Sequence, residues 1–356
     1  MSDKLRVGVI GCGAGYGHAQ NYAALDDVEL VALAGLDEDR CRQIGEELKI
    51  ARLFRDYSEL LELDEIDAVS VCVPNFLHAP ITIAALEAGK HVLVEKPLAT
   101  TVAEGESMAE AAAKAGLVLM PVFNYRFRKD SQLFKHFVQQ GNLGEIYYAR
   151  VGWLRSSGIP AGQGSWFIDK QRSGGGCLID LGVHMLDLSL WLMGGAHVTS
   201  VSAMTAATLG PQGKGAWGGR RFEGSLENFN VEDFVSAFLR LDNGVTMSLE
   251  VSWAGYTHFG DDFFVHLWGK EGGGEMNIAR YGTKDTLSFF NDMDGARTVS
   301  RPDTDGPTSL NINAEFVRAI TTGSVVSPTV DEGIHMLKII EAIYRSAAEQ
   351  REVTLS

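Results

Sequence analysis

Short apolar runs alternate with longer amphipathic stretches over the first third of the chain. The apolar runs predict strands over Arg6–Ile10, Glu29–Ala34, Ala68–Val73, His91–Glu95 and Leu117–Val122. The stretches between them predict helices over Tyr16–Leu25, Asp37–Leu48, Leu77–Ala88 and Val102–Ala115. Apolar strands that are separated by helices are typical of a parallel sheet covered on both faces. We therefore predict a doubly wound α/β domain over residues 1–122.

The pattern changes after residue 122. Helices are predicted over Ser131–Gln140 and Cys177–Trp191, with a strand, Ile146–Leu154, between them. Further strands follow without intervening helices, over Val198–Thr205, Phe234–Leu241, Val245–Trp253, Phe263–Gly269 and Thr286–Phe290. This succession, with the hairpin signal DNG at residues 242–244, predicts an α+β domain over residues 123–356 with a mainly antiparallel sheet.

Three further segments complete this second domain. The glycine-rich segment Thr208–Gly224 is expected to be an exposed loop. Two helices, Asn311–Thr321 and Asp331–Ala348, close the chain, and we expect the last of them to pack back on the first domain.

Composition narrows the class of protein. The chain has 356 residues and a formal net charge of −15, and such a field repels nucleic acid and anionic membranes, so we expect neither as a partner. No apolar run approaches the length of about 18 residues that a membrane span needs. Cys12, Cys41, Cys72 and Cys177 are widely spaced and form no CxxC pair, which favours a cytoplasm that keeps thiols reduced. We expect a cytoplasmic protein.

A glycine-rich loop, VGVIGCGAGYGHA, follows the first predicted strand. Gly11 and Gly13 allow backbone N–H groups to approach a pyrophosphate at the positive end of the next helix. The third glycine of the usual pattern is replaced by Tyr16, and a tight turn without a ligand is the alternative interpretation. We predict dinucleotide binding by a loop made of Gly11, Gly13, Ala14, Gly15 and Tyr16.

The end of the second strand bears on the choice of cofactor. Gly35 occupies the position where an acid that binds the ribose is expected, and Asp37 follows two residues later. Gly35 leaves room for a 2′-phosphate that Arg40 or Arg42 could bind, whereas Asp37 favours NAD. Asp37 also has an ordinary role as the N-cap of the next helix. NAD and NADP both stay open, with a slight lean towards NAD.

Two further motifs carry candidate catalytic groups. The apolar strand HVLV ends abruptly in Glu95, Lys96 and Pro97, at the strand end where ligands bind in parallel α/β sheets, although a strand-end salt bridge would look the same. Asp180 and His184 are four residues apart on a predicted helix and project from one face. A structural Asp–His hydrogen bond is the alternative for this second pair.

These motifs together resemble the Gfo/Idh/MocA oxidoreductases, which are named for glucose–fructose oxidoreductase and inositol dehydrogenase. The markers are the glycine loop, VCVPNFLHAP (Val71–Pro80), AGKHVLVEKPLA (Ala88–Ala99) and GGGCLIDLGVHMLDL (Gly174–Leu188). The resemblance implies a Rossmann domain followed by a domain with a large open sheet. In the family this sheet commonly forms the oligomer interface, so we expect a homodimer or homotetramer. Tyr16 and Gly35 depart from the family pattern.

The resemblance also assigns residues by position. It implies that Pro74, Asn75 and His78 line the cofactor site, with a capping role as the alternative for His78. It places Glu95 near the nicotinamide ribose, and Lys96 at the nicotinamide and the substrate, before a Lys96–Pro97 bond that can be cis in relatives. The residues that it assigns to the substrate are Lys96, Asn124, Arg126, Asp180 and His184. We add Trp166 and Asp169, because an aromatic ring and an acid suit a polyhydroxylated ligand. Trp166 could equally belong to the core, and a surface role is expected for Arg128.

The chemistry that follows is oxidation of a secondary alcohol of a sugar, a polyol or a sugar derivative with NAD or NADP. Lys96, Asp180 and His184 are the expected catalytic residues: His184 is the base, Asp180 orients it and Lys96 stabilises the alkoxide. Two alternatives remain, namely transient oxidation that drives elimination or glycoside cleavage, and a sensing regulator that has lost catalysis. No HExxH motif or Cys/His cluster suggests a metal site, and no nucleophile elbow supports a hydrolase.

Overall fold

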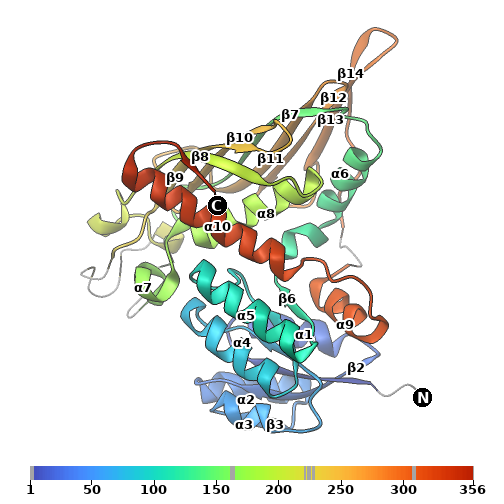
Figure 1. Cartoon of the computed structure of the whole chain (residues 1–356), viewed down its shortest axis with the longest axis vertical. Helices are drawn as coiled ribbons and strands as arrows, with labels where there is room; N and C mark the ends of the chain where they lie inside the picture. The colour runs from blue at the N-terminus through green and yellow to red at the C-terminus, as the bar shows by residue number, and fades with distance from the viewer. Residues whose placement is uncertain are drawn as a thin grey trace. The chain divides into compact units, whose positions relative to one another are not determined.

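The computed structural model of the protein describes residues 4–160, 165–219, 222, 226, 229–306 and 310–355. The chain separates into two compact units (Figure 1). One unit holds the residues up to Asn124 together with Leu310–Leu337, and the other holds the remaining described residues. The change of unit after Asn124 lies close to the predicted division at residue 122.

The first unit is built on a six-stranded sheet in the order β3-β2-β1-β4-β5-β6. All of its neighbouring strands pair in parallel, so the prediction of a doubly wound Rossmann sheet is confirmed. The strands are β1 (Leu5–Ile10), β2 (Val28–Ala34), β3 (Arg52–Phe54), β4 (Ala68–Val71), β5 (His91–Val94) and β6 (Leu119–Pro121). The order reverses between β1 and β4, and ligands bind outside the carboxyl ends of strands at such a switch point.

Helices connect these strands and complete the unit. They are α1 (Gly15–Ala23), α2 (Glu38–Leu48), α3 (Tyr57–Leu61), the 3-10 turn η1 (Asn75–Leu77), α4 (His78–Glu87), α5 (Val102–Ala115), α9 (Ile312–Thr322) and the first part of α10 (Val330–Glu349). The sequence did not predict α3 or the edge strand β3, which have only five and three residues. Val330, Ile334 and Leu337 of α10 pack against the core of this unit, as expected for the last helix.

The second unit contains a nine-stranded sheet in the order β14-β13-β12-β11-β7-β10-β9-β8-β15. Within the described part of this sheet, β7 and β10 are the only strands that pair in parallel, so the sheet is mainly antiparallel, as predicted. The strands are β7 (Ile146–Arg155), β8 (Val198–Ala206), β9 (Phe234–Leu241), β10 (Thr246–Ser252), β11 (Asp261–Gly269), β12 (Gly272–Ala279), β13 (Leu287–Met293), β14 (Ala296–Ser300) and β15 (Val353–Thr354).

Strand β12 was not predicted because its first three residues are glycines, which usually signal a turn. In the structure, Gly274 pairs with Leu267 of β11 and Phe289 of β13. A Cβ atom at Gly274 would lie 2.3 Å from the ring of Phe134. The glycine is therefore needed for close approach of an aromatic ring to the sheet, and it does not mark a turn.

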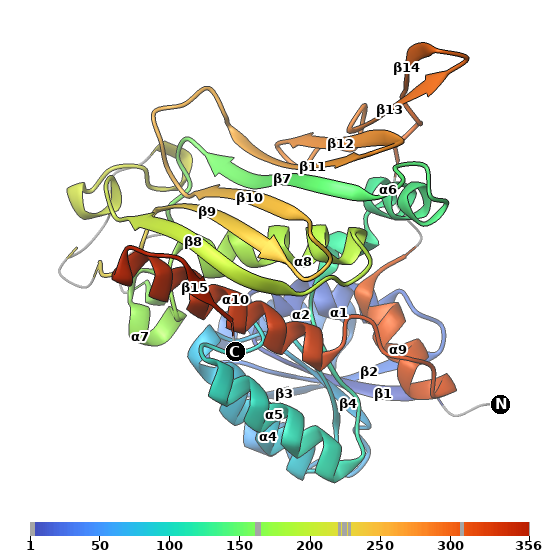
Figure 2. The same cartoon turned by 45° about the horizontal axis from the view of Figure 1, so that its top comes forward.

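One face of the nine-stranded sheet is covered by helices α6 (Lys129–Gln139) and α8 (Val183–Leu192), as Figure 2 shows. Along β10, Met247, Leu249 and Val251 are buried on this face, whereas Thr246, Ser248 and Glu250 alternate with them and are partly exposed. By length and composition alone the stretch Lys170–Leu192 could cross a membrane, but 89% of its apolar window is buried in the fold, as in the core helix of a globular protein.

Short helical turns complete the second unit. They are η2 (Asn124–Phe127), which begins at the unit boundary, η3 (Trp166–Ile168), α7 (Lys170–Ser173), the π-helical turn η4 (Leu178–Gly182), η5 (Gly210–Gln212) and η6 (Trp217–Gly219). The predicted loop Thr208–Gly224 contains η5 and η6, and Ala216 within it pairs with Ile159. Residues 220, 221, 223 and 224 of that loop lie outside the described residues.

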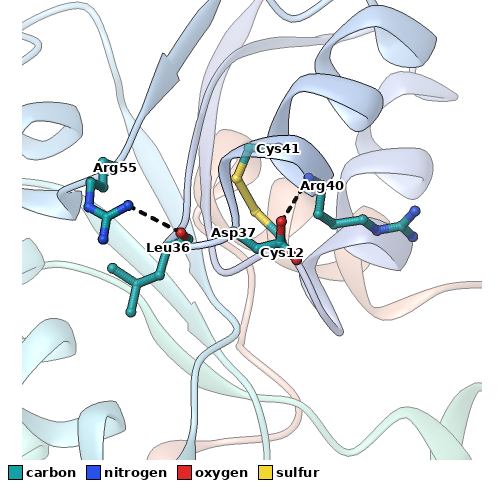
Figure 3. Close-up of a disulfide and its surroundings, with 6 residues drawn as sticks. All are labelled: Cys12, Leu36, Asp37, Arg40, Cys41 and Arg55. Atoms are coloured by element: carbon teal, nitrogen blue, oxygen red, sulfur yellow. Dashed lines mark hydrogen bonds between the residues drawn. A yellow bond between two sulfur atoms is a disulfide. The ribbon is translucent and has the colours of Figure 1, made fainter.

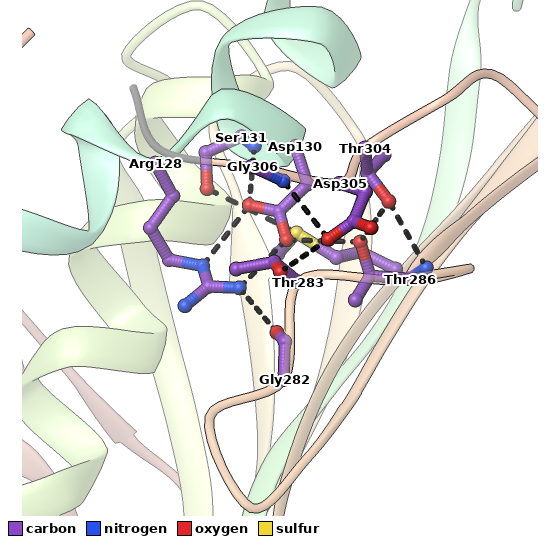
Figure 4. Close-up of polar contacts among 10 residues, drawn as sticks. Arg128, Asp130, Ser131, Gly282, Thr283, Thr286, Thr304, Asp305 and Gly306 are labelled. Atoms are coloured by element: carbon purple, nitrogen blue, oxygen red, sulfur yellow. Dashed lines mark hydrogen bonds and ion pairs between the residues drawn. The ribbon is translucent and has the colours of Figure 1, made fainter. Parts of the chain in front are cut away.

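A buried carboxylate ties the start of α6 to the far part of the sheet (Figure 4). Asp130 is 2% exposed and accepts hydrogen bonds from the guanidinium of Arg128 at 3.0 and 2.8 Å and from the hydroxyl of Thr286 at 2.9 Å. Thr286 also bonds Thr304 at 3.1 Å. Arg128 thus neutralises a buried acid, and the surface role expected for it is wrong.

Candidate active site

The glycine loop lies directly at the switch point of the parallel sheet. Gly11 has a φ of +108°, and a Cβ atom there would lie 2.0 Å from the backbone oxygen of Cys72, so only glycine fits. Gly13 and Gly17 differ, because a Cβ atom at either position would meet nothing within 4 Å. The loop is therefore packed against the end of β4 at Gly11 and open at Gly13, as a cradle for a phosphate group requires.

Tyr16 and Gly15 explain the departure from the usual third glycine. That glycine normally permits close packing of the helix on the strand. Here Gly15 does so, because a Cβ atom would lie 2.8 Å from Cγ1 of Val9 on β1. The Tyr16 side chain extends towards α2, where its hydroxyl donates to Glu47 at 2.6 Å and its ring lies under Arg40.

A disulfide between Cys12 and Cys41 joins the glycine loop to α2 (Figure 3). Cysteine spacing did not predict it, because the two residues are 29 positions apart and meet only through the fold. The sulfur atoms also occupy the space beside Gly35: a Cβ atom there would lie 2.3 Å from Sγ of Cys12 and 2.9 Å from Sγ of Cys41. A side chain at position 35 would therefore collide with the disulfide, so glycine is required there.

The polar residues after β2 have local partners. Asp37 is the N-cap of α2 and accepts a hydrogen bond from the backbone N–H of Arg40 at 3.0 Å. The Arg40 guanidinium lies 4.8 Å from the centre of the Tyr16 ring and donates to Gln43 at 2.8 Å. Arg42 pairs with Asp39 at 2.9 Å. Both arginines thus interact with their own helix or with α1.

A buried histidine, His18, links α1 to the strand that ends in the Glu-Lys-Pro motif. One ring nitrogen lies 3.2 Å from Oε1 of Glu95, and the other lies 3.1 Å from the hydroxyl of Ser70 and 3.1 Å from the side-chain amide of Asn313 on α9. The other carboxylate oxygen of Glu95 accepts from the backbone N–H of Lys96 at 3.1 Å. The carboxylate is thereby fixed in position from two sides.

The charges of this pair stabilise each other. Burial lowers the pKa of His18, but the neighbouring Cys72 and Glu95 outweigh burial and raise it to about 10. Burial raises the pKa of the Cys72 thiol, and the neighbouring His18 opposes that shift. Burial raises the pKa of Glu95, but His18 and Lys96 outweigh it and lower the pKa to about 2. An imidazolium and a carboxylate therefore face each other at neutral pH.

His18 is not among the site residues predicted from the sequence. A signal was present: His18, Ala19 and Tyr22 recur at helical spacing with Gly15 on the buried side of α1. A histidine on such an apolar face needs a polar partner. Its partners come from β4, β5 and α9, and sequence spacing does not reveal them.

His78 supports the same strand ends through the backbone. It is fully buried at the start of α4, with Nδ1 2.7 Å from the carbonyl oxygen of Pro97 and Nε2 2.9 Å from that of Val73. Burial lowers the pKa of His78 below its ordinary value. Pro74 and Asn75 lie between β4 and α4, and Asn75 is 7% exposed. His78 thus holds the segment that follows Lys96, and the Lys96–Pro97 bond is cis.

In the second unit, a buried glutamate positions the helix that carries the other candidate pair. Glu232 is 7% exposed, and its carboxylate accepts from the backbone N–H groups of Gly176 and Leu178, each at 3.0 Å, and from the Tyr344 hydroxyl at 3.0 Å. A Cβ atom at Gly176 would lie 1.9 Å from the backbone oxygen of Glu232. The glycine run before this helix thus allows a carboxylate to bind the helix N-terminus.

Asp180 and His184 follow one turn later, where η4 continues into α8. Asp180 accepts a hydrogen bond from the indole N–H of Trp253 at 2.9 Å. His184 is 7% exposed, and its ring packs edge-on against Tyr125, with 4.8 Å between ring centres, and lies 5.9 Å from Trp153. Aromatic side chains therefore position both members of the predicted pair.

The residues near Asn124 divide into two kinds. Asn124 itself is exposed at the start of η2. Arg126 is 3% exposed, and its Nε lies 2.9 Å from a carboxylate oxygen of Asp187, which is 1% exposed. This placement favours a structural role for Arg126 over a substrate contact.

Trp166 and Asp169 lie on the short turns before this helix. Trp166 is partly exposed and stacks on Phe167, with 3.9 Å between ring centres, so it is not a core residue. Asp169 is the N-cap of α7 and accepts from the backbone N–H of Gln171 at 3.1 Å. Among the described residues no group of three or more His, Cys, Asp or Glu side chains is arranged to hold a metal ion.

Comparison with known proteins gives the family. Residues 5–123 match the model of the oxidoreductase family with an NAD-binding Rossmann fold, GFO/IDH/MocA, and residues 131–275 match a GFO/IDH/MocA C-terminal domain. The chain therefore belongs to this family. It is 32% identical to D-glucoside 3-dehydrogenase of Escherichia coli K12 over 359 residues, which cover 99% of this chain and 98% of that protein.

Two further relatives agree with this assignment. The chain is 26% identical to scyllo-inositol 2-dehydrogenase (NADP(+)) of Bacillus subtilis strain 168, over 99% of this chain and 96% of that protein. The crystallised levoglucosan dehydrogenase in complex with NADH and L-sorbose superposes with a TM-score of 0.86 at 27% identity and covers 99% of both chains.

Proposed function

We propose that this protein is an NAD(P)-dependent dehydrogenase that oxidises a secondary alcohol of a sugar, a polyol or a sugar derivative. The observation that carries the proposal is the glycine loop after β1, at the switch point of the Rossmann sheet, with Glu95 and Lys96 at the end of β5, two strands away in the same sheet. The names of the relatives support the substrate class, since they act on a glucoside, an inositol and levoglucosan.

The loop fits a dinucleotide. The open space at Gly13 and the start of α1 at Gly15 leave room for a pyrophosphate at a helix N-terminus. Gly13→Val tests this directly, because the added side chain meets no protein atom within 4 Å of its Cβ position and would fill only the ligand's space. We expect a folded protein that has lost dinucleotide binding, measured by the quenching of tryptophan fluorescence. Undiminished affinity would remove the loop from the proposal.

The chain's own residues provide the proton chemistry. A bound nicotinamide supplies the hydride acceptor. The hydroxyl proton needs a base, and we assign this role to His184, since an imidazole with an unperturbed pKa of about 6.5 suits proton transfer near neutrality. Asp180, oriented by Trp253, favours the charged form of that imidazole. The Lys96 cation stabilises the negative charge that develops on the substrate oxygen.

A panel of substrates tests the activity. Inositols, aldoses, ketoses, sugar acids and alkyl glucosides are incubated with NAD or NADP, and the absorbance of the reduced nicotinamide is followed. We expect stoichiometric reduction with at least one class of the panel. A product formed without net cofactor reduction would instead indicate transient oxidation. Dinucleotide binding without turnover of any member would favour a sensor.

We further propose NAD as the preferred cofactor. Asp37 places a carboxylate after β2, where it repels a 2′-phosphate, while the Cys12–Cys41 sulfurs fill the space beside Gly35. Arg40 is engaged with Tyr16 and Gln43. We therefore expect a lower Kd for NADH than for NADPH, measured by titration. A preference for NADPH that Arg40→Ala or Arg42→Ala abolishes would reverse this assignment.

A homodimer or homotetramer is also proposed, with the outer face of the nine-stranded sheet as the contact. The apolar side chains of β10 lie on the covered face, so the support comes from aromatic residues on the other face. Tyr148 and Trp268 are cross-strand neighbours there, and Phe238 lies two strands away from Tyr148. Sedimentation velocity of the wild type and of Trp268→Arg tests this, with dissociation expected in the variant.

We also propose that the protein is cytoplasmic.

A further inference from the structure

The Cys12–Cys41 disulfide lies within the segments that hold the dinucleotide in the function proposed above. Cys12 stands between Gly11 and Gly13 in the phosphate loop, and Cys41 lies in the first turn of α2 after Asp37. Cys12 is 9% exposed and Cys41 is 3% exposed, so the bond is close to the surface on the side of the loop. The disulfide therefore joins the pyrophosphate loop to the helix that follows the ribose-binding strand.

Opening this bond must move the loop or the helix. Without the bond, the two sulfur atoms must be as far apart as other non-bonded atoms. For two carbon atoms, which are smaller than sulfur, that distance is about 3.5–4.0 Å. Both sulfurs lie close to Gly35, the residue after β2, as the short distances from its Cβ position show. The Cys12 and Cys41 side chains then separate, and the Cys12 loop and α2, which both belong to the proposed cofactor cradle, are no longer held together by a covalent bond.

We propose that Cys12 and Cys41 are a redox modification site, reversibly converted between disulfide and dithiol, and that the disulfide form binds the dinucleotide more tightly. The inference rests on the proposed dehydrogenase function. The physical reason is pre-organisation: the bond fixes the loop and α2 in the arrangement that the ligand needs, so less order is lost on binding. In the proposed cytoplasmic setting, disulfides are usually transient or redox-sensing, and seldom structural.

The exchange itself balances. The thiolate of a dithiol reductant attacks the sulfur of Cys12, which is the more exposed of the two. The sulfur of Cys41 leaves as a thiolate and takes up a proton. The second thiolate of the reductant then attacks the mixed disulfide, which releases Cys12 as a thiol and leaves the reductant as a cyclic disulfide. Two electrons and two protons pass to the protein. Cys72 and Cys177 are free cysteines outside the disulfide, and burial raises the pKa of each of these thiols, which disfavours their thiolate forms.

The first test counts thiols. The full-length protein is equilibrated with either oxidised or reduced dithiothreitol, then denatured and labelled with N-ethylmaleimide, and the labels are counted by mass spectrometry. The chain has four cysteines, so we expect four labels after reduction and two after oxidation. Peptide mapping should find the unlabelled pair at Cys12 and Cys41. Four labels in both samples would overturn the proposal, since no disulfide would form.

The second test measures the Kd for NADH in the same two samples. We expect the reduced protein to bind at least about fivefold more weakly, the lower end of usual coupling between sites. Cys41→Ser should bind with one affinity in both conditions, whereas the matched control Cys177→Ala, in the other unit, should keep the difference. Saturating NADH should also slow reduction by dithiothreitol, because coupling is reciprocal.

The outcomes separate the two proposals. Equal affinities for NADH in the oxidised and reduced wild type would overturn the redox inference and leave the dehydrogenase function intact. A difference that persists in Cys41→Ser would also overturn it, because the response would then come from another group. Failure of both NADH and NADPH to bind in either redox state would overturn the proposed function, and the redox inference with it.

Discussion

The two units hold their candidate site residues by different physical means. Glu95 in the first unit is fixed by a charged hydrogen bond to His18 and by the backbone of Lys96. His184 in the second unit is fixed by packing against Tyr125 and Trp153. A network of charges responds to pH, whereas packed rings respond to changes in volume. The first unit should therefore be sensitive to titration and the second to truncation.

The largest effect is expected from His184→Ala. If the imidazole is the base, its loss should lower kcat by about 10²–10⁴-fold, the usual contribution of a positioned acid–base group. The measurement is steady-state turnover on whichever substrate the panel identifies. The dinucleotide Kd should stay the same, because the glycine loop belongs to the other unit.

A control separates chemistry from packing in that experiment. His184→Phe keeps a ring against Tyr125 and removes the base, so it should lose as much turnover as the alanine variant while unfolding at a temperature closer to that of the wild type. Near-normal turnover in either folded variant would transfer the role of base to another group. Lys96 would be the first to test.

The next effect concerns stability in the second unit. Asp187→Ala leaves the guanidinium of Arg126 buried without its carboxylate, and breaking such a buried pair costs about 3–5 kcal/mol. Urea unfolding measures it. Asp39→Ala is the matched control, because the Arg42–Asp39 pair is exposed, with side-chain exposures of 60% and 91%, and such pairs contribute at most about 1 kcal/mol. Equal losses in the two variants would contradict the assignment of a buried pair.

The comparison also shows what sequence could predict. Apart from the short edge strand β3, the strands of the first unit follow from uninterrupted apolar runs, and the glycine loop and the Glu-Lys-Pro motif fall at strand ends. In the second unit β12 was missed, because Gly274 serves packing against Phe134 and not a turn. A glycine that marks a turn and a glycine that makes room for an aromatic ring look identical in the sequence. Only the neighbouring residue in the folded structure distinguishes them.

The candidate site divides in the same way. Asp180 and His184 were found because their spacing is local. Their aromatic supports are distant in the sequence. Trp253 is 73 residues from Asp180, and Tyr125, which packs on His184, lies on the separate turn η2. The same holds for the Cys12–Cys41 bond. Residues that meet only in the tertiary structure have no characteristic spacing in the sequence, so their contacts could not be predicted from it.

A smaller effect is expected from His18→Gln in the first unit. Glutamine can still donate a hydrogen bond to Glu95 but carries no charge, so the variant loses the charged part of a bond that is worth about 1.5–3 kcal/mol. The raised pKa of His18 gives stability that is complete below pH 6.5 and is lost as pH rises towards 10. The lowered pKa of Glu95 gives stability that is complete above pH 4.5 and is lost as pH falls towards 2.

Urea unfolding across this range measures the effect. The wild type should lose stability between pH 6.5 and 10, and His18→Gln should lose less over the same interval, because no imidazolium is discharged. Tyr148→Phe, which changes a hydroxyl in the other unit, is the control and should follow the wild-type curve. Parallel curves for His18→Gln and the wild type would mean that His18 is neutral in the folded protein.

The smallest effect, and the sharpest test of the difference between the units, is expected from Trp253→Phe. Phenylalanine keeps most of the ring but removes the N–H that bonds Asp180 at 2.9 Å. A hydrogen bond of ordinary strength contributes about 0.5–1.5 kcal/mol, so kcat should fall about two- to tenfold. Because Trp253 lies in the second unit, the Kd for NADH should not change. A lower affinity for NADH with unaltered kcat would show that Trp253 supports the cofactor and not the catalytic pair.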